Sequence, residues 1–352
     1  IQSAGTIPPQ ETGLTYNSWF GKFHLEMIWW HEAQFALWNR SNLLDRTLGW
    51  YEKVEPIARQ IAQRQGFDGV RWMKMTDPSG TEAPSKVGSF LIWQQPHLIY
   101  LAELLYRADP TKEVLEKYNR LVQETAEFMY SFATYDELEG RYVLKGAIPA
   151  QETLRAAETI NPPFELSYWH FAMQTAQQWR ERMGQQRSLE WDEMIDKLSP
   201  LASNNEGLYL AAETAIDTSD HMAVLGAVGI LPMNKLIRED YMKNTLHWIW
   251  DNWNWGKTWG WDYPMTAMNA ARLGEPEKAV GALLMDKRTN TYLPNGHNYQ
   301  DGRLRIYLPG NGGLLTAIAM MCAGWDGCTE TNPGFPKDGT WNVRWEGLKP
   351  LP

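Results

Sequence analysis

Several carboxylates of this sequence stand near the starts of predicted helices or in the loops before them. They are Glu26, Glu32, Glu152, Glu158, Glu165, Asp217, Asp220, Asp262 and Asp301. Hydrolysis of a glycosidic bond needs a carboxylic acid that protonates the leaving oxygen and, in most enzymes, a second carboxylate as base or nucleophile. Any one such residue is more often a helix cap or a solvated side chain. Asp217 and Asp220 fit caps of the following helix, and Glu165 fits a first-turn acid.

Tryptophan is unusually abundant, at 19 residues. Many of these tryptophans lie near predicted helix starts or in loops: Trp19, Trp29, Trp30, Trp72, Trp93, Trp169, Trp253, Trp255, Trp259 and Trp261. Indole rings have flat apolar faces and a polar edge, which suits stacking on sugar rings. An acidic, helical, tryptophan-rich chain is typical of carbohydrate-active enzymes, and the alternative is that these rings are only core aromatics.

Histidines and loop cations offer further polar groups. His24, His31, His97, His221 and His297 are candidates to border a cleft, where a histidine usually hydrogen-bonds sugar hydroxyls. The long loops also hold five basic residues: Lys74, Lys86, Arg155, Arg303 and Arg305. Arginine pairs with carboxylates in a fork geometry, which would suit a uronate. Solvated loop cations are the favoured interpretation.

Hydrophobic periodicity predicts about eleven helical segments. They cover residues 24–40, 47–65, 91–107, 109–132, 164–183, 189–198, 219–228, 235–250, 259–273, 276–285 and 313–323. A small hairpin is expected at 140–144. Alternating strands and helices are absent, which argues against a parallel α/β sheet.

The connections after the second, fourth, sixth and tenth segments are long, whereas most of the others are short turns. Every second connection lies at the same end of an up-down ring of helices, so the long loops decorate one face. Function tends to reside in such scaffold-borne loops. We therefore predict an all-α fold, an (α/α)6 barrel whose odd-numbered helices form the inner ring. One catalytic domain is expected over 1–352, with an irregular arm at 1–20 and an irregular tail at 325–352.

Composition limits the classes of partner. The chain has 352 residues, 43% of them hydrophobic, and a net charge of −9, which argues against nucleic acid. No segment reaches the roughly 18 apolar residues of a membrane helix. The chain begins without Met, as a processed or trimmed product does. Cys322 and Cys328 fit a small disulfide or two free thiols equally well, and no spacing indicates zinc. We predict no metal and no cofactor.

Five stretches resemble known carbohydrate-active families. The stretch 24–31, HLEMIWWH, resembles the first-inner-helix motif of family-95 glycoside hydrolases, the α-fucosidase group, and the Trp/acid motif of family-65 maltose and trehalose phosphorylases. The stretch 148–152, IPAQE, followed by Asn161, is similar to the loop of family 65 that carries its general acid. Residues 220–232, 259–279 and 308–313 are similar to later segments of family 95.

The resemblance implies an (α/α)6 barrel with an inverting glycosidase or phosphorylase activity, and Glu152 as the general acid. At the last motif family 95 has its general-base aspartate where this chain has Pro309. We expect Glu26 to replace that base, with Asp220 and Asp262 as the next candidates. Family 95 also carries a β-sandwich ahead of its barrel, and these 352 residues contain no similar segment, so we expect either a fragment or a barrel-only relative. The expected substrate-binding residues are His24, Trp29, Trp30, Trp93, Gln94, Gln151, Asn161, His221, Trp261, Asp262 and Asn311.

Three functions remain open from the sequence. The first is a glycoside hydrolase that acts by inversion on an oligosaccharide or glycan side chain; its phosphorylase variant would bind phosphate at the glycine-rich stretch 310–313. The second is a polysaccharide lyase with a His or Tyr base, such as His24, His221 or Tyr307. The third is a non-catalytic carbohydrate-binding barrel. The expected substrate class suggests a periplasmic or extracellular location.

Overall fold

A computed structural model of the protein describes residues 22–215 and 218–352. Its longer helices are α1 (Ile28–Leu37), α2 (Ser41–Gln65), α3 (His97–Ala108), α4 (Lys112–Phe132), α5 (Pro163–Arg182), α6 (Leu189–Lys197), α7 (Glu239–Asn252), α8 (Asp262–Arg272), α9 (Pro276–Leu283) and α10 (Leu308–Ala323). A 3₁₀ helix, η3 (His221–Ala227), follows α6, and shorter ones are η1 (Leu25–Met27), η2 (Ala156–Glu158), η4 (Trp255–Lys257) and η5 (Arg288–Asn290).

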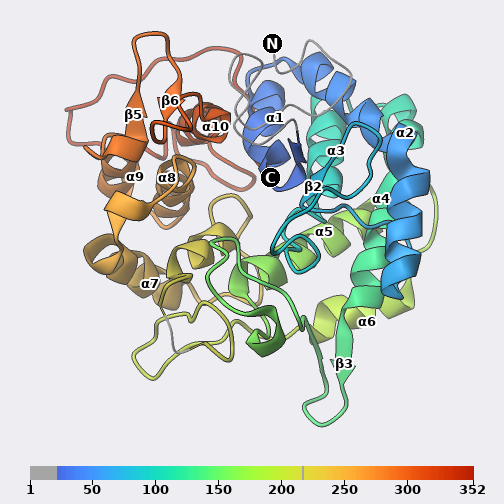
Figure 1. Cartoon of the computed structure of the whole chain (residues 1–352). Helices are drawn as coiled ribbons and strands as arrows, with labels where there is room; N and C mark the ends of the chain where they lie inside the picture. The colour runs from blue at the N-terminus through green and yellow to red at the C-terminus, as the bar shows by residue number, and fades with distance from the viewer. Residues whose placement is uncertain (1–21, 216–217) are drawn as a thin grey trace.

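Six helical elements form a closed inner ring. α1, α3, α5, η3, α8 and α10 contact one another in that order, and α10 returns to pack against α1. Figure 1 shows the closure directly, because the colours run round the molecule in sequence order until red α10 lies beside blue α1. The intervening helices pack on the outside of this ring, as α2 does on α1 and α3. The predicted (α/α)6 barrel is confirmed, with the odd-numbered predicted segments inside.

The two layers differ in how their residues are buried. In α1 every residue but one is buried, and α8 buries all of its residues except the last. By contrast α2 and α4 alternate buried and exposed positions at helical spacing, as expected of helices with one apolar stripe. The inner helices are therefore buried along most of their length, although Leu315 in α10 is 38% exposed.

Two inner elements differ from the sequence prediction. The predicted helix at 219–228 is the 3₁₀ helix η3, and the last helix begins at Leu308 instead of Gly313. A Cβ at Gly312 would overlap the carbonyl oxygen of Trp30 in α1. Gly312 and Gly313 are therefore helical residues that let α10 approach α1 closely. They lie within the first two turns of α10 and not in a loop before it.

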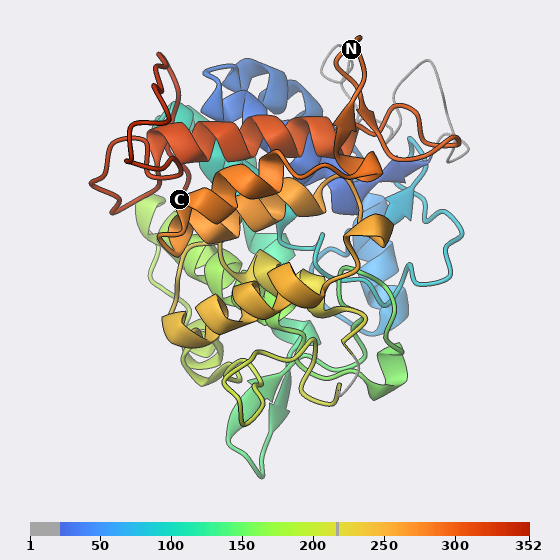
Figure 2. The same cartoon turned by 90° about the vertical axis from the view of Figure 1, so that its left-hand side faces the viewer.

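Short ladders connect the loops. The predicted hairpin is present as β3 (Thr134–Asp136) and β4 (Arg141–Val143), and it projects away from the helices in Figure 2. β1 (Phe23–His24) pairs antiparallel with β2 (Met75–Thr76), and β5 (Thr291–Tyr292) pairs antiparallel with β6 (Asn298–Tyr299). The loops before α3 and α5 are joined by a bridge between Leu91 and Ile148. Backbone hydrogen bonds thus connect the long loops to one another.

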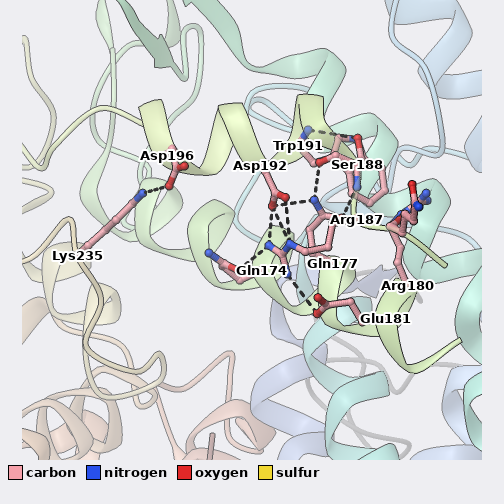
Figure 3. A network of polar contacts seen from close by, with 11 residues as sticks. Gln174, Gln177, Arg180, Glu181, Arg187, Ser188, Trp191, Asp192, Asp196 and Lys235 are labelled. Carbon is pink, nitrogen blue, oxygen red and sulfur yellow. Dashed lines mark hydrogen bonds and ion pairs between the residues drawn. The ribbon is translucent and has the colours of Figure 1, made fainter. Parts of the chain in front are cut away.

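A polar network fixes the short turn between α5 and α6 (Figure 3). The guanidinium of Arg187 donates to Asp192, and its Nη1 lies 3.3 Å from Glu181. Ser188 caps α6 by accepting the Trp191 N–H at 3.3 Å. Gln177 of α5 donates to the Ser188 carbonyl at 2.7 Å. These bonds satisfy polar groups at the turn and hold α6 against α5.

Residues 324–352 contain no helix and no named strand, and they return to the inner ring. The Lys349 N–H donates to the Leu37 carbonyl at the end of α1, and Arg107 of α3 forms a two-bond ion pair with Asp326. Cys322 and Cys328 are free thiols. Within the described part of the chain, no helix combines the length and apolar character required to span a membrane.

Candidate active site

A cavity of about 140 Å³ opens where the loops meet the N-terminal ends of the inner helices. Its walls come from five separate segments, each of which lies in the connection before an inner helix: His24, Glu26, Met27, Lys74, Met75, Ala150, Gln151, Glu152, Trp259, Trp261 and Tyr307. The cavity therefore lies on the face that the loop lengths predict. It contains two of the three predicted catalytic carboxylates, Glu26 and Glu152.

Glu26 is held rigidly at the base of this cavity. It lies in η1 just ahead of α1, and only 2% of its surface is exposed. The Nε2 of His97 lies 3.0 Å from the Glu26 carbonyl oxygen, which fixes the backbone. Its Oε1 lies 3.2 Å from Nδ1 of His24, whereas Oε2 is buried without a donor among the described residues. An unsatisfied buried carboxylate oxygen can accept a hydrogen bond from water or from a sugar hydroxyl.

Glu152 faces Glu26 from the loop before α5. Its φ of 63° lies in the left-handed region, which is uncommon for a side chain other than Gly, Asn or Asp. Its N–H donates to the Pro149 carbonyl at 2.9 Å, so residues 149–152 form a tight turn. Burial raises the pKa of the Glu152 carboxyl, the Lys74 ammonium opposes this rise, and the charge of Glu26 adds to it. A raised pKa suits a general acid.

Lys74 connects the two carboxylates. Its ammonium forms an ion pair with Oε1 of Glu152 and lies 3.8 Å from Oε1 of Glu26. Only 8% of the residue is exposed. The Lys74 carbonyl accepts the Leu25 N–H at 2.8 Å, which joins its loop to the segment that carries Glu26. The sequence interpretation of Lys74 as a solvated loop cation is wrong, because the side chain is buried between two acids.

Gln151 and Asp262 form a contact beside Glu152. The Gln151 amide donates to Oδ1 of Asp262 at 2.8 Å, and Oδ2 of Asp262 accepts the Trp259 N–H at 2.9 Å and the Thr258 hydroxyl at 3.1 Å. Asp262 is the first residue of α8 and is completely buried. Burial raises its pKa to about 7, against the hydrogen bonds it accepts. Gln151 lines the cavity, and Asp262 lies behind it.

Asp220 directly precedes η3, and its side chain contacts the turn that carries Glu152 from the side opposite Asp262. Its Oδ2 accepts the N–H groups of Thr153 and Leu154, each at 2.8 Å, and also the Thr153 hydroxyl. Asp220 is buried and does not line the cavity. Burial raises the pKa of its carboxyl against these three donors. The structure therefore places this predicted catalytic residue behind the Glu152 turn.

Aromatic rings form one wall of the cavity. Trp261 lines it and stacks on Trp93 with ring centroids 5.8 Å apart, and Trp30 packs on Trp261 at 5.2 Å. Trp259 and Tyr307 complete the wall with centroids 5.7 Å apart. Trp261 is only 1% exposed, so the partly exposed ring of Trp259 supplies the apolar surface that suits a sugar ring.

Three predicted substrate-binding tryptophans lie in the core instead of the cavity wall. Trp29, Trp30 and Trp93 are at most 1% exposed. Gln94 is also buried, and its amide nitrogen donates to the Leu91 carbonyl at 2.7 Å. These side chains support the cavity wall from behind.

Three further predicted binding residues, Asn161, Asn311 and His221, also lie away from the cavity. Asn161 accepts the Leu144 N–H at 2.8 Å and donates to Glu213 at 2.6 Å, which fixes the loop before α5. Asn311 likewise holds the 296–298 turn, because it accepts the Asn298 N–H at 2.9 Å. His221 packs on the ring of Trp248, with ring centroids 4.6 Å apart.

The other carboxylates noted in the sequence have separate surroundings. Glu32 and Glu165 are buried in the helical layer, and burial raises the pKa of each to about 8. Glu158 is exposed, and Asp301 accepts the N–H groups of its own turn. Asp217 falls outside the described residues. The described residues contain no group of three or more His, Cys, Asp and Glu side chains arranged to hold a metal.

Lys74, Trp259 and Tyr307 line the cavity, although the sequence analysis named them only among loop cations, aromatic residues and possible lyase bases and did not include them in the expected hydrolase site. Trp259 and Tyr307 stand directly before predicted inner helices, which is the signal that could have identified them. Lys74 has no comparable signal, because its partner Glu152 is 78 positions away in the sequence.

No family model matches this sequence, and no curated protein matches it. Solved structures match its fold. A protein described as a kojibiose phosphorylase from the human microbiome aligns with a TM-score of 0.67 at 10% identity, over 92% of this chain and 53% of its own. A wild-type glycosidase aligns at 0.64 and 12% identity over 90% and 91% of the two chains.

A rhamnosidase from Klebsiella oxytoca with rhamnose bound aligns with a TM-score of 0.54 at 11% identity, over 85% of this chain and 57% of its own. The chain thus spans little more than half the length of the phosphorylase and the rhamnosidase, and nearly the full length of the glycosidase. Identities this low establish the fold alone. The chain has the (α/α)6 fold that these glycosidases and phosphorylases share.

Proposed function

We propose that the chain is a glycoside hydrolase in which Glu152 protonates the leaving oxygen and Glu26 is the second carboxylate. The observation that carries the proposal is that both acids line one cavity and contact the same ammonium, that of Lys74. A pair of carboxylates on opposite sides of the scissile bond is the usual apparatus of glycoside hydrolysis. The solved neighbours of this fold, a phosphorylase, a glycosidase and a rhamnosidase, support the same class of substrate.

The roles follow from the different surroundings of the two acids. Glu152 is a third exposed at its side chain and has a raised pKa, so it can carry a proton into the leaving group. Glu26 is more deeply buried, beside His24, with one oxygen open to a donor. This suits a base that orients water. We propose inversion because the family resemblance implies it. One ammonium contacts both acids, so the two carboxylates lie close together, and the anomeric configuration of the first product decides between inversion and retention.

The test is a panel of oligosaccharides and aryl glycosides, assayed for new reducing ends with wild type and Glu152→Gln. The variant should lose about 10²–10⁴-fold in kcat on substrates with poor leaving groups, the typical contribution of a general acid. Glu158→Gln is the matched control, because Glu158 is an exposed acid of the same loop. An unchanged rate in Glu152→Gln would overturn the assignment, and retained anomeric configuration in the first product would overturn inversion.

A lyase is the second candidate, because His24, Lys74 and Tyr307 lie together in the cavity. Proton abstraction next to a uronate carboxyl needs a base and a cation that neutralises the carboxylate. Here the ammonium of Lys74 already faces two glutamates, which would repel an acidic sugar. The same assay separates the two reactions, since a lyase produces an unsaturated sugar that absorbs in the ultraviolet. Dependence of turnover on inorganic phosphate would instead identify a phosphorylase.

A further inference from the structure

We propose that Asp220 is a positioning residue that holds the turn carrying Glu152, and that it is not a general base. This inference rests on the proposed role of Glu152 as the acid. Asp220 comes from the segment before η3, and its Oδ2 accepts three donors from Thr153 and Leu154. These are the two residues that directly follow Glu152 in the chain.

The turn needs support from outside. Glu152 has a φ of 63°, a backbone conformation that persists in a non-glycine residue only where the surroundings enforce it. On one side Gln151 donates to Asp262 at the start of α8, and on the other side Thr153 and Leu154 donate to Asp220. Buried carboxylates from two neighbouring inner elements thus hold the residues on both sides of Glu152.

The surroundings of Asp220 exclude a direct role in activating water. The residue has no exposed surface and does not line the cavity. Its Oδ2 is occupied by three donors, and its Oδ1 is buried without a partner among the described residues. A general base must lie within hydrogen-bond reach of the water it deprotonates. Asp220 instead acts as a hydrogen-bond acceptor, and that function requires an oxygen atom but no negative charge.

This distinction makes Asp220→Asn the decisive variant. The amide oxygen of Asn can take the place of Oδ2 and accept the same three donors, and its NH₂ group then occupies the site of the unpartnered Oδ1. A positioning residue should therefore tolerate the change, and a base should not. Asp220→Ala removes the acceptor in either case.

Kinetics should use glycosides of one sugar with leaving groups of graded acidity. We expect Asp220→Asn to keep kcat within a few-fold of wild type. Asp220→Ala should lose kcat mainly on poor leaving groups, with little change in KM, because only these need protonation by Glu152. Glu152→Gln gives the reference pattern. An Asn variant as inactive as the Ala variant, with an equal loss on every leaving group, would identify a base and overturn the proposal.

Hydrogen exchange supplies a readout that does not depend on turnover. The amides of Thr153 and Leu154 should be protected in wild type and in Asp220→Asn, and should exchange faster in Asp220→Ala. Equal protection in all three proteins would overturn the proposal, even if the wild type hydrolysed no glycoside. If Asp220→Ala does not fold, Thr153→Val removes only the hydroxyl donor and should show a weaker form of the same leaving-group pattern. If Thr153→Val folds but loses no activity on poor leaving groups, and Asp220→Asn is inactive, the positioning role of Asp220 is also overturned.

Discussion

The ammonium of Lys74 contacts the carboxylate of Glu152 directly, although the two residues come from different loops of the barrel. The loop before α3 supplies Lys74, and the loop before α5 supplies Glu152. The pairing joins the two neighbouring loops at the point where the cavity opens, and it keeps Glu152 more acidic than burial alone would allow.

Replacing Lys74 should therefore shift the pH dependence of the reaction. Burial raises the Glu152 pKa, and the ammonium of Lys74 lowers it, so Lys74→Met should raise this pKa further. A general acid is active while it is protonated, and the rate falls as the pH rises through its pKa. The alkaline limb of the kcat/KM profile should consequently move to higher pH in Lys74→Met.

Lys86→Met, a change at an exposed position in the same loop, should leave the alkaline limb in place. An alkaline limb that stays or moves to lower pH would contradict the ion pair.

The contact between α1 and α10 gives a prediction on stability. A Cβ at Gly312 would overlap the carbonyl oxygen of Trp30, and backbone atoms cannot move aside as a flexible side chain can. Gly312→Ala should lower the free energy of unfolding by about 1–3 kcal/mol or more, as overpacking does. Gly49→Ala is the control, because Gly49 lies in α2 with no atom within 4 Å of a new Cβ. That change should stabilise the helix by about 0.5–1 kcal/mol. Denaturant unfolding of both variants tests the pair.

The same contact explains where sequence reasoning about the fold failed. Glycine is a poor helix former, so the run at 310–313 indicated a loop before the last helix. Tertiary packing overrides that preference, since only glycine allows α10 to lie against Trp30. The order of elements and the loop-bearing face were predictable, because amphipathic periodicity and loop length are local properties of a sequence.

The candidate site was predictable only in part, for a related reason. Glu26 and Glu152 could be selected because each lies in a stretch that resembles a known family. The depth of a side chain depends on contacts between distant segments, as the placement of Trp93 shows. Trp93 and Trp259 both precede inner helices, yet Trp93 is enclosed by Trp261 and Phe164, whereas Trp259 borders the cavity. Helical spacing does not distinguish these two environments.

Those two tryptophans should respond differently to truncation. Trp93→Ala should cost about 3–5 kcal/mol of stability, because it empties a fully buried site. Trp259→Ala removes a partly exposed ring from the cavity wall. Aromatic contacts contribute about 0.5–1.5 kcal/mol, so its KM should rise about two- to tenfold with little change in unfolding. Thermal unfolding and steady-state kinetics on both variants check this, and a reversed pattern would show that the cavity wall is misassigned.

Buried Glu165 should make stability depend on pH. It lies in the first turn of α5, where burial raises its pKa from 4.5 to about 8 and the charge of Asp220 adds to the effect. Between these values the folded chain holds a proton that the unfolded chain has lost, so folding is linked to proton uptake. The contribution of Glu165 is fully present below its unfolded pKa and is lost as the pH rises through about 8. Glu165→Gln cannot ionise, so its free energy of unfolding should fall less steeply with pH than that of wild type.

Glu190→Gln changes an exposed first-turn acid of α6 and should keep the wild-type slope. Urea unfolding at a series of pH values measures these slopes, and identical slopes for wild type and Glu165→Gln would mean that the Glu165 carboxyl is not buried as the structure describes.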